Sequence, residues 1–256
     1  GSHNKREKQA YKSNPDIKLN MSQYNVQLVP LAEKYVKGFY NITKDYRKEH
    51  EERMKIERED RKKKFNVMLD NSRNVVADEL LFTATNRFFK NMSNEDLMKW
   101  ANTCMEFVYK DLGYTKEQVL HATLHVDEKT PHIHCVVIPL VKKLDNRTKT
   151  ERYTISKKQY IKDNIHLSQL QDKYHQRLTE KGFDLERGIK GSDNVFINVK
   201  ELKKLTRKLN IDLNNKTQRL SESVKDLQDK MKSNKNVLFD KEYVKIKKDT
   251  FDTMNK

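Results

Sequence analysis

The stretch "VLHATLHVDEKTPHIHCVVIP", residues 119–139, carries the strongest structural signal in the chain. Its two apolar runs flank the polar segment "DEKTP", which predicts two strands joined by a short connection, with Pro131 outside the strand ladder. Side chains alternate along a strand, so His132 and His134 are expected to point to one face. His125 ends the neighbouring predicted strand. The pattern therefore predicts three imidazoles that converge on one point.

Three converging imidazoles indicate a metal site. Neutral imidazole is a common ligand of divalent transition metals, and a three-histidine set leaves positions open for substrate, which is typical of a catalytic site. Asp127 or Glu128 could orient a ligand imidazole, or Glu128 could accept a proton. His121 shares the alternation of His125, and we expect it to be structural. Three further histidines lie in charged helical patterns and are expected at the surface: His50, His166 and His175.

The composition points to a polyanionic partner. The 256 residues contain 53 Lys and Arg against 37 Asp and Glu, a formal net charge of +16. Such an excess favours nucleic acid, with an anionic membrane surface as the rival interpretation. No apolar run approaches the roughly 18 residues of a spanning helix. Cys104 and Cys135 lie in apolar patterns and imply no disulfide framework, so the cytoplasm is the expected compartment. A basic protein with an open metal site suggests phosphoryl-group chemistry on nucleic acid.

The order of the elements predicts an α+β fold, an antiparallel sheet covered by helices. "YNVQLV" and "NVVADELLFTAT" are typical of strands. Ser93 and Asp96 resemble a capping box that opens a helix, and Gly113 lies just beyond its expected end. A further helix is expected over residues 156–182.

Two segments are too charged to be buried along their length. Residues 31–64 predict one long helix, either a solvated arm or an arm that contacts DNA. From about Asn198 the chain is again charged and heptad-like. We expect a domain over residues 1–190 and a helical extension over 191–256 that resembles the start of a coiled coil.

Four segments, in order, resemble a known family. "HVDEKTPHIH" followed by "CVVIP" resembles the metal motif of HUH-type relaxases, specifically the MobV group of plasmid mobilisation and recombination (Mob/Pre) proteins. "HNKR" with "SNPDI" and "SQYN" is similar to the N-terminal motif of that group. "VVADELLFTAT" resembles its middle segment, and "GFDLERG" a run after its later helix. The resemblance covers about His3 to Gly188.

The resemblance implies a HUH-relaxase-like fold and a DNA endonuclease and strand transferase. Such an enzyme nicks one strand of plasmid DNA at an origin of transfer and keeps the 5′ end covalently attached. The motif histidines map to His125, His132 and His134, holding Mn²⁺ or Mg²⁺. The histidine of the "HN" motif, His3, would be the nucleophile and form a phosphoramidate.

Other residues enter through the same resemblance. The rival nucleophiles are the tyrosines Tyr11, Tyr24 and Tyr35. Val26 follows Asn25 where several relatives have a tyrosine, which weakens a tyrosine mechanism. Arg6 would clamp the scissile phosphate with its planar fork, or be an ordinary basic helix residue. Glu79 and Glu128 join the catalytic candidates. Lys5, Arg6 and Arg73 are the expected DNA contacts, and the C-terminal helices suggest a dimer.

Two alternatives stay open. The first is a rolling-circle replication initiator of the HUH type, which shares the metal chemistry. The second is a non-catalytic DNA-binding protein with a structural Zn²⁺, although Cys135 has the opposite strand parity to His134 and does not easily supply a fourth ligand. Relatives carry a further strand ahead of the "HN" motif, whereas the printed sequence begins with Gly1-Ser2, a pair typical of vector-derived residues. Without that strand, activity would be in doubt.

Overall fold

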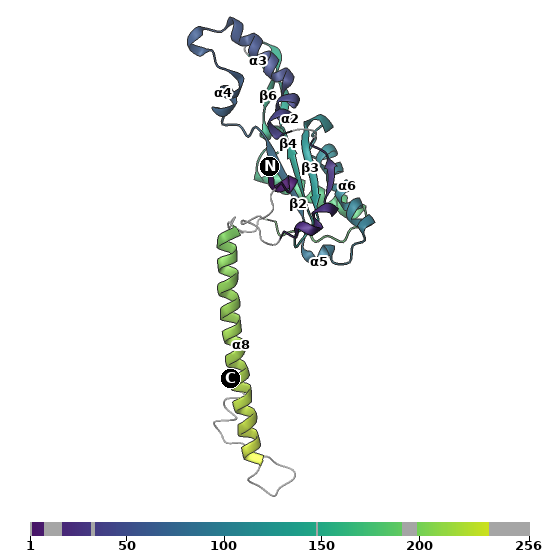
Figure 1. Ribbon diagram of the computed structural model, residues 1–256, viewed down its shortest axis with the longest axis vertical. Helices are drawn as coiled ribbons and strands as arrows, with labels where there is room; N and C mark the ends of the chain where they lie inside the picture. The colour runs from purple at the N-terminus through teal and green to yellow at the C-terminus, as the bar shows by residue number, and fades with distance from the viewer. Residues whose placement is uncertain (1, 8–16, 32–33, 147, 191–198, 236–256) are drawn as a thin grey trace. The chain divides into compact units, whose positions relative to one another are not determined.

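The computed structural model divides the chain into two compact units, Gly1–Lys190 and Gly191–Lys256. It describes residues 2–7, 17–31, 34–146, 148–190 and 199–235. The first unit holds two antiparallel sheets and the helices that pack on them (Figure 1). The expected α+β class is confirmed.

The main sheet has four antiparallel strands in the order β1-β3-β4-β2. Their bounds are β1 Val26–Val29, β2 Asp78–Thr83, β3 Val119–His125 and β4 His132–Val137. The two strands expected around the histidines are thus the two central ones. In their register His125 lies opposite His132, and Thr123 lies opposite His134. All three motif histidines therefore lie near one end of the central pair.

One face of this sheet packs on two long helices, α6 (Asn94–Lys110) and α7 (Asn164–Glu180). Ser93 caps α6 as expected, because its side chain accepts a hydrogen bond from the Asp96 amide. Ile133, Cys135 and Val137 of β4 are fully buried in this core. The opposite parity of β4 leaves His132 and His134 for the other face.

That other face meets the N-terminal elements: α1 (Ser2–Lys5), the 3-10 turn η1 (Leu19–Tyr24) and α2 (Tyr35–Ile42). Gly38 lets α2 approach the sheet closely, because a Cβ atom there would lie 2.4 Å from Cδ1 of Leu120. His121 is buried and bonded to Tyr35 of α2, so its expected structural role is consistent with its surroundings.

The expected single helix over residues 31–64 is wrong in its extent. The segment contains α2, α3 (Lys44–Ile56) and the 3-10 turn η2 (Glu59–Arg61), and α4 (Phe65–Asp70) follows it. Thr43 separates α2 from α3 with a non-helical backbone, and Glu57 is extended. Figure 1 shows α3 and α4 projecting beyond the main sheet as an arm. Uniform charge predicts solvated helix but does not reveal where the chain turns back.

The placement of His50 on the surface is also wrong. Its side chain is 3% exposed because α3 and α4 close over it. Nε2 of His50 donates to the Lys63 carbonyl over 2.8 Å, and its ring packs on Phe65. A residue in a charged pattern is buried here through contacts that arise only when the arm folds back.

A second sheet was not predicted. It pairs β5 (Leu140–Asp145) with β6 (Thr150–Ile155), and the amide of Tyr153 donates to Glu49 of α3. The helix expected from residue 156 starts later, at Asn164, where Asp163 caps it by accepting from the His166 amide. The remaining short elements are α5 (Asn86–Phe89), η3 (Lys116–Gln118) and η4 (Lys157–Gln159).

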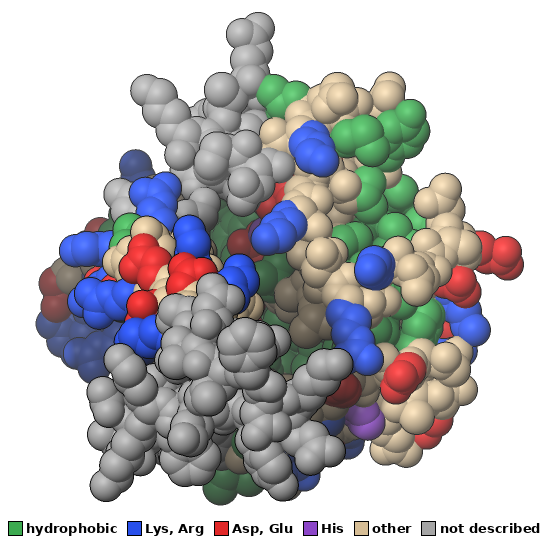
Figure 2. Space-filling model, turned by 90° about the horizontal axis from the view of Figure 1, so that it is seen from below, with side chains coloured by type: hydrophobic (Ala, Val, Ile, Leu, Met, Phe, Trp, Pro, Cys, Tyr) green, Lys and Arg blue, Asp and Glu red, His purple; other side chains and the backbone are tan. Residues whose placement is uncertain are grey.

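The second unit contains α8, Val199–Lys235. Leu213 and Leu220 of this helix are exposed, one heptad apart. Within the part of the chain that the structure describes, no helix is long and apolar enough to cross a membrane. Figure 2 shows Lys and Arg side chains dispersed among acidic and apolar ones on the face turned to the viewer.

Candidate metal centre

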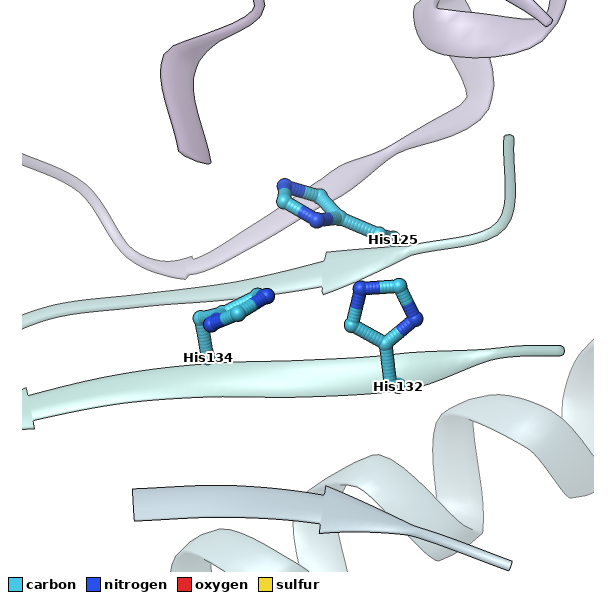
Figure 3. A group of neighbouring side chains, drawn as sticks. All are labelled: His125, His132 and His134. Carbon is cyan, nitrogen blue, oxygen red and sulfur yellow. The ribbon is translucent and has the colours of Figure 1, made fainter. Parts of the chain in front are cut away.

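The three motif histidines meet as the strand pattern predicts. His125 comes from β3, and His132 and His134 come from β4. Their ring centroids are 5.0 to 5.3 Å apart, and one ring nitrogen of each lies within 4.8 Å of the others. Figure 3 shows the rings on one side of the two strands, turned toward a shared space.

Each imidazole donates a hydrogen bond to an oxygen atom that can act only as an acceptor, and this bond orients the ring. Nε2 of His125 donates to the Asn4 carbonyl over 3.1 Å, and Nδ1 of His132 donates to the Thr130 carbonyl over 2.9 Å. Nδ1 of His134 donates to Oε1 of Glu79 over 3.1 Å. These bonds determine which nitrogen carries the proton, so in a neutral ring the other nitrogen keeps a lone pair for a metal.

Burial keeps His125 and His132 in the neutral form that binds metals. Burial lowers the pKa of His125 to about 3, and the nearby Arg6 cation adds to that effect. Burial also lowers the pKa of His132. The hydrogen bond with His134 lowers the pKa of Glu79 to about 2, so this carboxylate is ionised at neutral pH and can only accept. Neutral imidazoles backed by a carboxylate and carbonyls are the donor set of a divalent transition metal.

Arg6 lies beside this cluster in a carboxylate clamp. Its Nε and Nη2 donate to the two oxygens of Asp127, each over 2.7 Å, and Nη2 also donates to Glu128 over 2.6 Å. The Arg6 side chain is 7% exposed. Burial alone would raise the pKa of Asp127, but hydrogen bonds from Arg6 and Ser22 outweigh it and hold that pKa well below its ordinary value. Arg6 therefore neutralises two carboxylates that, with His125, would otherwise form a second three-ligand group.

The N-terminal candidates lie against the same face. α1 carries His3 in its backbone, and the adjacent Asn4 is 6% exposed and bonded to His125. Nothing in the residue pattern singled out Asn4 except its place in the "HN" pair. Lys5 lies over the Tyr35 ring, 5.9 Å from its centroid.

The rival tyrosines are placed differently from one another. Tyr35 OH is 2.7 Å from Nδ1 of His121, and burial raises its pKa. Tyr24 is 57% exposed at the end of η1. Tyr11 lies outside the described residues. Of these, Tyr35 is engaged in a hydrogen bond on the metal face, away from the three ligands along β3.

Glu128 lies beside the cluster, and Arg73 lies in a groove at the edge of the sheet. Nε2 of His132 lies 3.7 Å from Glu128, which also binds Arg6. Arg73 and Glu79 line the same groove, of about 730 Å³, beside the edge strand β2. The groove thus connects a basic residue to the carboxylate that orients His134.

A fourth protein ligand from Cys135 is ruled out by its position. Its side chain is fully buried in the α6–α7 core, on the opposite face from the imidazoles. Burial raises the pKa of its thiol to about 12, which keeps it protonated. Cys135 of β4 therefore adds no fourth ligand to the three-histidine set, whereas a structural zinc site has four protein ligands.

The sequence comparison identifies the family. The family profile described as plasmid recombination enzyme (Mob_Pre) matches residues 1–204. A plasmid recombination enzyme from a Bacillus species is 31% identical over 214 residues, which cover 82% of this chain and 44% of that protein. A type 1 enzyme from Staphylococcus aureus is 34% identical over 108 residues, 42% of this chain and 24% of the relative. The chain belongs to the Mob/Pre family of plasmid recombination enzymes, as the four segments indicated.

Solved structures agree on the fold. A Mn-bound crystal structure of the MobM relaxase domain, in complex with plasmid oriT DNA, is 24% identical and has a TM-score of 0.59. The match covers 80% of this chain and 89% of that domain. The chain spans less than half the length of the Bacillus relative. The likeness to the relaxase domain confirms the expected fold.

Proposed function

We propose that this protein is a metal-dependent DNA relaxase that nicks one strand of plasmid DNA at an origin of transfer and stays attached to the 5′ end. The observation that carries the proposal is the three-histidine cluster with α1, the helix of His3, bonded directly to it. Family membership and the Mn- and oriT-bound relaxase domain of similar fold support it.

In this proposal the residues of the site have separate roles. His125, His132 and His134 hold Mn²⁺ or Mg²⁺, which when bound polarises a phosphate oxygen and offsets the charge of the transition state. Neutral His3 attacks the scissile phosphorus, so a P–N bond forms as the bond to the 3′ oxygen breaks. The 3′ oxygen would take up a proton from solvent, and Glu128 is the candidate to accept the proton that His3 releases.

Glu79 and Arg6 have positioning roles in this scheme. Glu79 is ionised and bonded to His134, so it orients a ligand rather than donating a proton. The fork of Arg6 already binds Asp127, so a phosphate would have to compete with a bidentate carboxylate bond. We therefore assign Arg6 to seating α1 beside the metal centre.

The nucleophile is tested by the acid stability of the covalent DNA adduct. A P–N bond is acid-labile, whereas a tyrosyl phosphodiester survives mild acid. The trapped adduct should therefore dissolve in mild acid and be lost in His3→Ala. Denaturing gels before and after acid treatment measure both.

Tyr24→Phe and Tyr35→Phe are the matched controls and should keep the adduct. An acid-stable adduct that persists in His3→Ala would show that the nucleophile is a tyrosine. Metal-dependent nicking of supercoiled plasmid separates the relaxase from a non-catalytic DNA-binding protein. A relaxase transfers the nicked strand, whereas a rolling-circle initiator starts replication from it. A transfer assay therefore separates these two functions.

We propose that DNA reaches the centre along the groove beside β2. Arg73, Lys158 and Lys162 line this groove together with Glu79, so it holds cationic side chains as well as the carboxylate that orients His134. Plasmid DNA would place this activity in the cytoplasm. We propose a dimer through α8, in which the exposed leucines of this helix are buried. Sedimentation of the full chain, compared with sedimentation of the Leu213→Asp variant, tests the dimer.

A further inference from the structure

Asn4 is linked to two of the three histidines, to His125 directly and to His134 through Glu79. Its main-chain carbonyl accepts from Nε2 of His125 over 3.1 Å. Its side-chain Nδ2 donates over 2.8 Å to Oε1 of Glu79, the same oxygen that accepts from Nδ1 of His134 over 3.1 Å. One buried residue thus bridges a ligand of β3 and a ligand of β4.

The short helix α1 presents Asn4 in this way because of how it ends. α1 ends at Lys5, so the Asn4 carbonyl has no partner within the helix and can accept from His125 instead. Arg6 follows with a φ of 53°, in the left-handed region that terminates helices. The guanidinium of Arg6 then binds Asp127 and holds the helix end in place.

The amide of Asn4 suits this position chemically. Glu79 is ionised, so its oxygen requires donors, and Asn4 and His134 both supply one. Alanine at position 4 would keep the carbonyl bond to His125 but remove the donor to Glu79. Outer hydrogen-bond partners of this kind orient metal ligands, and their loss typically weakens metal affinity about 10- to 100-fold.

We propose that Asn4 is a positioning residue that couples the docking of α1 to metal binding. The contacts that seat α1 are the contacts that orient His125 and His134, so each process favours the other. Such coupling is reciprocal: a bound metal must hold α1 in place as strongly as a docked α1 improves metal affinity. The significance for catalysis rests on the proposed relaxase function, because α1 carries His3.

The coupling is measured by calorimetric titration of the full chain with Mn²⁺, without DNA. Asn4→Ala should weaken Mn²⁺ binding by about 10-fold, at the low end of the range for outer partners. Because Asn4 acts on His134 through Glu79, the double variant Asn4→Ala/Glu79→Ala should bind no more weakly than Glu79→Ala alone. In the Glu79→Gln background, which retains an acceptor oxygen, Asn4→Ala should still weaken binding.

Hydrogen exchange supplies a second readout that a merely structural role would not change. Mn²⁺ should slow amide exchange in α1 of the parent, and this metal-induced protection should be smaller in Asn4→Ala. Glu95→Gln, a change at an exposed carboxylate of α6, is the control and should leave both quantities unchanged.

Parent-like Mn²⁺ affinity in Asn4→Ala, or full additivity with Glu79→Ala, would overturn the proposal. Should Asn4→Ala fail to fold, the Glu79→Ala and Glu79→Gln variants still test whether α1 protection depends on this link. A parent that shows the coupling but forms no covalent DNA adduct would refute the relaxase function and leave the coupling standing.

Discussion

His132 and His134 show how a period of two places individual side chains. Both point from β4 toward His125, and each is bonded through Nδ1 to an outer acceptor. Loss of one ligand leaves two imidazoles, which is a weaker metal set than a typical open catalytic site. The affinity of the centre should therefore depend strongly on each ring.

We predict that His134→Ala weakens Mn²⁺ binding by more than about 100-fold, beyond the usual loss for an outer partner. Calorimetric titration measures the affinity, and metal-dependent nicking should disappear with it. His175→Ala, a half-buried histidine of α7, is the control. Parent-like affinity in a His132/His134 double alanine variant would disprove the metal assignment.

His121 makes stability depend on pH. Burial lowers its pKa to about 4, while the unfolded chain has an ordinary histidine pKa near 6.5. Between these values the unfolded state binds the proton first, so stability is fully present above about pH 6.5 and declines as pH falls toward 4. The contribution lost between pH 7.5 and pH 5 is roughly 2 kcal/mol.

This effect is tested by urea unfolding of the metal-free protein at both pH values. His121→Asn does not titrate and retains polar groups for Tyr35 and Thr123, so it should show a smaller loss of stability in acid than the parent. Identical pH dependence in the two proteins would show that His121 does not contribute.

At the scale of elements, one buried histidine links the two helices of the arm. His50 of α3 donates to the Lys63 carbonyl and packs on Phe65 of α4. The bond from His50 to the Lys63 carbonyl therefore ties the end of the basic segment between these helices, residues 57–64, to α3.

We predict that His50→Ala opens this segment locally, at a cost of about 1–3 kcal/mol, because the Lys63 carbonyl loses its donor and a cavity forms beside Phe65. Trypsin should then cleave within residues 57–64 several-fold faster than in the parent, since local opening limits proteolysis. Mn²⁺ affinity should not change, because β3 and β4 are untouched. Unaltered cleavage rates would contradict the role assigned to His50.

Across the whole molecule, charge determines how binding responds to salt. The formal net charge is +16, and Lys or Arg contacts with phosphates release counterions from DNA. We predict that the logarithm of DNA affinity falls linearly with the logarithm of salt concentration, and that Arg73→Ala reduces that slope by about 1. Fluorescence anisotropy on a labelled origin strand measures the slope.

His134→Ala is the control for this experiment, because it removes a metal ligand and leaves the cationic groups in place. Its DNA binding should keep the parent slope. A binding constant that is flat between low and moderate salt would contradict the electrostatic interpretation of the basic composition.

The sequence by itself determined the central hairpin and its cluster of three histidines. The apolar run at residues 119–125 indicates β3, and the parity of His132 and His134 follows from alternation. Ser93 and Gly113 mark the limits of α6 through capping chemistry. These features depend on neighbours a few residues apart. Local physics is sufficient to predict them.

Only the tertiary structure decided which distant residues serve those ligands. Asn4 and Glu79 are 75 residues apart in sequence, yet they share a hydrogen bond that orients His134. His50 is buried because α3 and α4 fold back, and the charged β5–β6 pair forms against α3. Such contacts depend on loop closure and packing between separate segments, and no short-range period or capping rule encodes their partners.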